Sequence, residues 1–131
     1  MTLPGPVGLV AYARLHRPGS DLPQRLRLLV GQLAALRSGC SWCADRNRHL
    51  ALRAGVSAVD VDQVCQYATA PGYSEPERAA LALADAISGL GGTERGFPIE
   101  VLAAARRHFS EPEIMALVGT VTEEHPIPAS R

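Results

Sequence analysis

Two cysteines separated by two residues, Cys40-Ser41-Trp42-Cys43, are the feature of this sequence best suited to chemistry. Cysteines at this spacing can close a small disulfide ring, so one thiolate can attack a peroxide or a disulfide and the other can resolve the product. The only other cysteine is Cys65, and the N-terminal residues do not resemble a secretory signal. An odd count of three in such a chain favours redox chemistry or metal binding over a structural disulfide framework.

Two other interpretations of the pair stay open. The first is a zinc site built from Cys40, Cys43, His49 and Cys65, because zinc takes four ligands of these types. His49, however, lies six residues beyond Cys43, which turns it roughly 120° away from that face of a helix. The second is structural, with buried cysteines and Trp42 filling the core. We expect redox chemistry, with no metal and no cofactor.

The elements around the pair should place it at a helix start. Gly39 is expected to close one helix, and the dithiol to open the next, which runs to about Ala54 before Gly55. Both sulfurs then lie in the first turn, where free N–H groups and the helix dipole favour a thiolate over a thiol. Arg37 and Arg46 would lower the pKa of the thiols further if they point toward them.

Helix starts recur along the chain. Four segments begin with a side-chain acceptor that is followed three residues later by an acid or an amide, as in a capping box. They begin at Asp21, Ser57, Ser74 and Ser110. Apolar residues at helical spacing follow three of these starts, and they predict faces that form the core. The stripes are Leu26, Leu29, Val30 and Leu33; Ala80, Leu83, Ala84 and Ile87; and Ile114, Leu117, Val118 and Val121.

Glycines are expected to end the helices in the left-handed conformation, at Gly39, Gly55, Gly72 and Gly89. A further helix should run from Pro98 to about Phe109, and no segment shows the alternation of a strand. We therefore predict an all-α, single-domain bundle of about six helices over residues 1–131. Residues 1–20 should be a weakly ordered start with a weak helix at 7–15, and residues 126–131 an irregular tail.

Charge and hydropathy exclude several classes of partner. Thirteen basic and thirteen acidic residues cancel, and no Lys/Arg run suggests nucleic acid or an anionic membrane surface. The longest apolar stretches reach about half of the roughly 18 residues of a membrane span. These observations predict a cytoplasmic protein that binds neither nucleic acid nor a membrane.

The segment from about Leu22 to Val64 resembles the AhpD-like branch of the carboxymuconolactone decarboxylase family. The similar parts are the arginine-rich run 23–30, the dithiol, and the run 51–57; the stretches 83–86 and 107–111 also resemble that family. The resemblance implies an all-helical fold, a homo-oligomer, and alkylhydroperoxidase or thiol–disulfide activity. The partners would be a hydroperoxide or disulfide substrate and a thiol reductant.

In peroxidase members of this family, a glutamate on the preceding helix and a histidine four residues after the second cysteine relay protons. This sequence has Leu28 and Asn47 at those positions. Asn47 shares a helix face with Cys43, so it can hydrogen-bond a sulfur or the substrate. An amide, however, does not exchange a proton near neutral pH as imidazole does.

The main hypothesis is an AhpD-like thiol oxidoreductase with Cys40, Cys43 and Asn47 in the site and Cys43 as the attacking sulfur. The alternative is a non-catalytic oligomeric scaffold or small-ligand binding module that kept the fold and lost the relay. Small residues on later helices support self-association; they are Ala79, Ala82, Ala86 and Ala103 to Ala105. Two further histidines, His108 and His125, have no partner that the sequence reveals and are expected at the surface.

Overall fold

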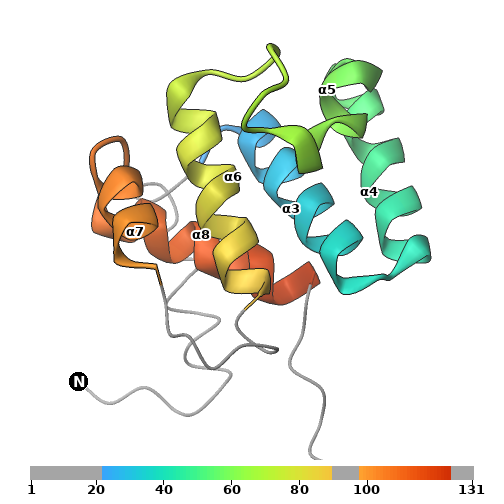
Figure 1. Ribbon diagram of the computed structural model, residues 1–131. Helices are drawn as coiled ribbons and strands as arrows, with labels where there is room; N and C mark the ends of the chain where they lie inside the picture. The colour runs from blue at the N-terminus through green and yellow to red at the C-terminus, as the bar shows by residue number, and fades with distance from the viewer. Residues whose placement is uncertain (1–21, 90–97, 125–131) are drawn as a thin grey trace, which may run out of the picture.

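The computed structural model describes residues 22–89 and 98–124, and every regular element within these ranges is helical (Figure 1). The elements are α3 (Gln24–Ser38), α4 (Ser41–Arg53), α5 (Ala58–Asp62), the short 3₁₀ helix η1 (Val64–Gln66), α6 (Glu75–Ser88), α7 (Ile99–Arg106) and α8 (Glu111–Glu124). The prediction of an all-α bundle of about six helices is thus confirmed. The expectations for residues 1–20 and 126–131, with the weak helix at 7–15, lie outside the described residues. None of the described helices is long and apolar enough to cross a membrane.

Helix α3 lies at the centre of the bundle and packs against α4, α6 and α8 (Figure 1). Its predicted stripe is buried, and Leu29, Val30 and Leu33 are fully buried. Each such side chain stabilises the fold by about 1.5–3 kcal/mol relative to exposure. The predicted stripes of α6 and α8 also face the core, except that Ile87 and Val118 are only half-buried. Packing against α4, α6 and α8 thus fixes the position of α3. The turn that contains the two cysteines begins at the C-terminal end of α3.

A helix begins in or directly after each of the four predicted segments, and at three of them the expected side-chain cap is formed. Ser74 and Ser110 each form a reciprocal capping box with the glutamate three residues later. The hydroxyl of Ser57 accepts the N–H of Asp60. In the fourth segment, 21–24, α3 begins at Gln24, but the expected side-chain cap is wrong, because the N-cap residue is Pro23, whose ψ of 142° is extended, and no side chain caps the helix.

The glycine predictions are half right. Gly39 (φ 76°) and Gly55 (φ 94°) adopt the left-handed conformation, whereas Gly89 has a φ of −85° and Gly72 has no positive φ. Gly72 is needed for a different reason: a Cβ at this position would overlap the carboxylate of Asp60. The backbone here must approach another side chain closely, which is the second common reason for a glycine.

Next to the contact between Gly72 and Asp60, Arg25 of α3 hydrogen-bonds to three other parts of the chain. From α3 it donates to Glu77 Oε2 at 2.7 Å, to Asp60 Oδ2 at 3.0 Å and to the carbonyl of Gly72 at 2.9 Å. The carboxylates of Asp60 and Glu77 are mostly buried, at 18% and 17% exposed. Because planar Arg forks bind such acceptors with defined geometry, this side chain fixes α3 relative to α5 and to the start of α6.

The Arg25–Glu77 pair should make the free energy of unfolding depend on pH in the acidic range. Burial alone would raise the pKa of Glu77, but hydrogen bonds from Arg25 and Ser74 hold it below 4.5. A depressed pKa in the folded state adds stability that is complete above the unfolded value and is lost as the pH falls through the folded value. We expect Arg25→Met to lower the free energy of unfolding by about 1–3 kcal/mol at neutral pH, and by progressively less in acid.

Urea unfolding of both proteins at a series of pH values measures this difference. Arg106→Met is the matched control, since it removes only the exposed pair with Glu111 and such pairs contribute little. If the free energies of unfolding of wild type and Arg25→Met differ by the same amount at every pH below 4.5, the Arg25–Glu77 pair is not the source of the pH dependence.

Candidate redox site

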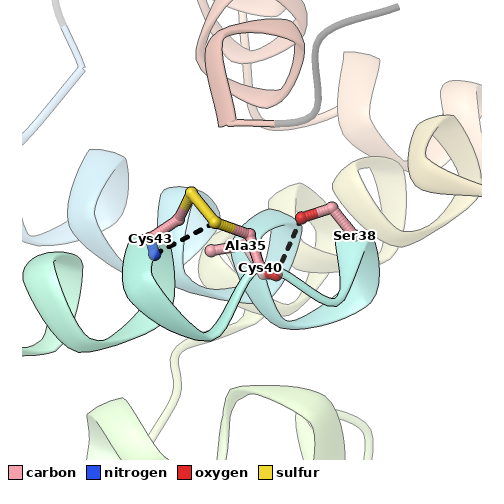
Figure 2. The surroundings of a disulfide bond; sticks show 4 residues. All are labelled: Ala35, Ser38, Cys40 and Cys43. Carbon is pink, nitrogen blue, oxygen red and sulfur yellow. Dashed lines mark hydrogen bonds between the residues drawn. A yellow bond between two sulfur atoms is a disulfide. The ribbon is translucent and has the colours of Figure 1, made fainter. Parts of the chain in front are cut away.

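The turn between α3 and α4 places the dithiol. Cys40 is the N-cap residue of α4 and Cys43 lies in its first turn, so the motif stands at a helix start as predicted. Left-handed Gly39 lets the chain reverse, and the N–H of Cys40 then donates to the carbonyl of Ala35 at 3.3 Å. The hydroxyl of Ser38 donates to the same carbonyl at 2.8 Å (Figure 2). The first cysteine is thus fixed by the end of the helix before it.

The two cysteines form a disulfide, with their Cα atoms 5.2 Å apart (Figure 2). Cys40 Sγ accepts the backbone N–H of Cys43 at 3.1 Å, so the sulfur takes the place of the oxygen in an ordinary N-cap. Both residues are half-buried. After reduction, the same N–H group and the helix dipole favour Cys40 as a thiolate.

Two expectations about the surroundings of the sulfurs, the burial of Trp42 and the direction of Arg37, are wrong. Trp42 is 70% exposed, so the idea that it fills the core is wrong, and the guanidinium of Arg46 stands 5.2 Å from the centre of its ring. The pairing is a cation–π contact at the surface. Arg37 points to α6 instead of toward the thiols, because its Nε donates to Asp85 Oδ1 at 2.8 Å.

Tyr67, which directly follows η1, contacts the same carboxylate of α6 and is a weak acid. Its hydroxyl donates to Asp85 Oδ2 at 3.1 Å. Burial, together with the charge of Asp85, raises the pKa of Tyr67 to about 12. The phenol therefore does not supply protons near neutral pH, and it serves to orient the Asp85 carboxylate toward Arg37.

Leu28 and Asn47, which the sequence resemblance sets at the positions of the family's proton relay, occupy different environments. Leu28 is half-buried and packs against the hydrophobic core. Asn47 is only 5% exposed, and its Nδ2 has no hydrogen-bond partner. The hydrogen bond from this amide to a sulfur, one of the two possibilities allowed by the sequence, is therefore not formed in the disulfide state.

A second buried polar residue, Gln32, was not predicted from the sequence. It is 4% exposed, and its Oε1 has no partner. Gln32 and Asn47 are the two buried polar residues in the part of the chain that the structure describes. The available signal was an amide between Val30 and Leu33, inside an otherwise apolar stripe.

The zinc hypothesis finds no support in geometry. His49 is exposed, and Cys65 is a half-buried free cysteine in η1. Within residues 22–89 and 98–124, no group of three His, Cys, Asp or Glu side chains could hold a metal ion. His108 is exposed beside Phe109, and His16 and His125 lie outside the described residues.

An open hollow of about 320 Å³ lies between α6 and α7, away from the dithiol turn. Three of the small residues expected to support self-association line it, namely Ala79, Ala82 and Ala104. Arg78, Arg107 and His108 lie around them.

An all-helical bundle with a CxxC disulfide at the start of α4, the helix that follows the central helix α3, defines a class of thiol-containing proteins. A profile of the carboxymuconolactone decarboxylase family matches residues 8–86, more than half of the chain and the whole dithiol region. The protein belongs to this family, and the resemblance recognised in the sequence is confirmed. Compared with curated protein sequences, the chain has no significant match.

Solved structures share the fold. One is a protein of unknown function from Agrobacterium tumefaciens whose name suggests an AhpD antioxidant defence protein; it is 25% identical, with a TM-score of 0.75, over 93% of this chain and 82% of that one. Another is the debrominase Bmp8, 26% identical with a TM-score of 0.66, matched over 92% of this chain and 66% of its own length. Bmp8 C82A in complex with 2,3,4-tribromopyrrole is similar at 25% identity and the same TM-score. The family fold thus occurs in proteins with different named activities.

Proposed function

We propose that this protein is an AhpD-like thiol oxidoreductase that reduces hydroperoxides with Cys40 and Cys43. The observation that carries the proposal is the disulfide at the start of α4, in which Cys40 Sγ accepts the N–H of Cys43. In the overall reaction, the dithiol and ROOH give the disulfide, ROH and water. A thiol reductant then returns the disulfide to the dithiol.

The two sulfurs take different roles. Cys43 shares a helix face with Asn47, so its thiolate attacks the peroxide, breaks the O–O bond and becomes a sulfenic acid, while the leaving alkoxide takes a proton from water. Cys40, held as a thiolate by the helix start, attacks the Cys43 sulfur. Hydroxide leaves and is protonated to water, and the disulfide is formed.

Proton transfer is the weak part of this cycle. With Leu28 and Asn47 in place of the relay, the protons on the leaving oxygens come from solvent. Positioned acid–base groups typically contribute about 10² to 10⁴ in rate. The enzyme should therefore be slower than relay-containing members of the family by about this factor.

The likeness to the debrominase favours a second candidate, reductive debromination of a bromopyrrole. A thiolate would take the bromine, the ring carbon would take a proton, and the second thiolate would displace bromide to close the same disulfide. The dithiol is oxidised and the carbon–bromine bond is reduced to carbon–hydrogen. Both candidates thus use one cycle and differ only in the electrophile.

The first test is one dose of tert-butyl hydroperoxide, or of 2,3,4-tribromopyrrole, added to the reduced protein. We expect the peroxide to be consumed in one equivalent and the intact mass to fall by two hydrogens. Protein oxidised beforehand is the control, because it has no thiols to donate. An unchanged mass with both compounds would reject both activities and leave the non-catalytic scaffold or small-ligand module.

A further inference from the structure

The two buried polar residues of the described chain, Gln32 and Asn47, leave opposite hydrogen-bonding groups unused. Gln32 Oε1 is an acceptor and Asn47 Nδ2 is a donor, and neither has a partner. An unsatisfied buried polar group costs about 1–3 kcal/mol, and native proteins retain few of them. Two unsatisfied buried amide groups, one on α3 and one on α4, do not stabilise the fold, so they need another explanation.

The short connection between α3 and α4 places Gln32 and Asn47 at similar distances from the turn, measured along their helices. The two helices lie side by side and are joined by only Gly39 and Cys40 (Figure 1). Gln32 precedes Gly39 by seven residues, and Asn47 follows Cys40 by seven. At 1.5 Å per residue, each amide lies about 10 Å along its helix from the turn.

Asn47 also faces the neighbouring helices. The buried residues of α4 are Ala44, Asn47 and Ala51, which form one stripe at helical spacing. Among the described elements, α4 packs chiefly against α3 and also against α5. The amide of Asn47 is thus directed into this interface, one helical turn from Cys43.

We propose that Gln32 and Asn47 together bind the hydroperoxyl group of the substrate, an inference that rests on the proposed function. Gln32 Oε1 accepts the O–H of the peroxide, and Asn47 Nδ2 donates to a peroxide oxygen. Residues four apart on a helix have their Cβ atoms about 5–6 Å apart, so a group held at Asn47 lies within reach of Cys43 Sγ. The amides bind and orient the peroxide and transfer no proton.

Removing either amide should weaken use of the peroxide without weakening the fold. For Gln32→Met and for Asn47→Leu we expect kcat/KM for tert-butyl hydroperoxide to fall about tenfold, mostly through KM, the effect of one hydrogen bond. The rate of reaction with an aromatic disulfide reagent should not change. The thermal midpoint should stay or rise, because each change removes an unpaired buried group. Gln66→Met makes the same chemical change at an exposed position and should alter neither property.

Binding can be measured without turnover. The disulfide form cannot reduce a peroxide, so titrating it with tert-butyl hydroperoxide should shift the side-chain amide NMR signals of Gln32 and Asn47 in a saturable way. Such shifts without turnover by the reduced protein would reject the proposed function and keep the binding site. Turnover without these shifts, or variants with a lower thermal midpoint and unchanged kinetics, would overturn the binding site and show that the amides are structural.

Discussion

A Cys40→Ser variant should stop after a single oxidation and carry a sulfenic acid on Cys43, whereas Cys43→Ser should not react with peroxide at the active site. In the first variant the attacking thiolate is intact, but no second sulfur closes the disulfide. In the second, the nucleophile itself is missing. Turnover should fall on the order of 10³-fold or more in both, as expected when a nucleophile that acts as part of a unit is removed.

Trapping with dimedone after one peroxide dose, followed by intact mass and peptide mapping, identifies the oxidised sulfur. Cys65→Ser is the matched control, because Cys65 is a free cysteine outside the pair, and it should retain full turnover. An adduct on Cys40 in the Cys43→Ser variant would reverse the order of attack while keeping the dithiol mechanism. Full turnover in either single variant would reject that mechanism.

Installing the family's relay should produce the largest gain. We expect the double variant Leu28→Glu with Asn47→His to raise kcat/KM for a hydroperoxide by about 10² to 10⁴, the usual contribution of positioned acid–base groups. The new imidazole would stand one turn after Cys43, with a pKa near 6.5, and its N–H can still donate to the peroxide as the Asn47 amide does. Each single change should yield much less, since the two groups act together.

The pH profile separates this gain from a packing effect. The double variant should acquire a new ionisation in kcat/KM near the histidine pKa, which the wild type lacks. Leu36→Glu is the control, because it adds a carboxylate on α3 at an exposed position. No gain in the double variant, with the fold retained, would mean that these two positions do not serve the sulfurs in this chain.

Local signals in the sequence predicted most of the fold. The buried stripes, the capping boxes at Ser74 and Ser110 and the left-handed Gly39 depend on residues within one or two turns, so their patterns are visible in the chain. Gly72 was misinterpreted because its role depends on the Asp60 carboxylate, which is distant in sequence. Nothing in the neighbourhood of a glycine reveals which side chain approaches it in space.

The sequence predicted the disulfide-forming pair of the candidate site and singled out Asn47 beside it, but Gln32 was missed. The spacing of Cys40 and Cys43 was sufficient to expect a disulfide-forming pair at a helix start. Gln32 escaped notice because a glutamine in a helix is usually solvent-exposed. Burial of its amide depends on α3 being surrounded by α4, α6 and α8. This burial comes from helices that are distant in sequence, so the local sequence around Gln32 does not reveal it.

The exposed indole between the two cysteines also gives the protein an optical signal of its own. Trp42 is the one tryptophan in the chain, is 70% exposed, and adjoins Cys43. A disulfide quenches the emission of a neighbouring indole by electron transfer, and a dithiol does so less. Intrinsic fluorescence should therefore brighten on reduction and dim on oxidation, so that each half of the catalytic cycle can be followed in real time by stopped flow without a label.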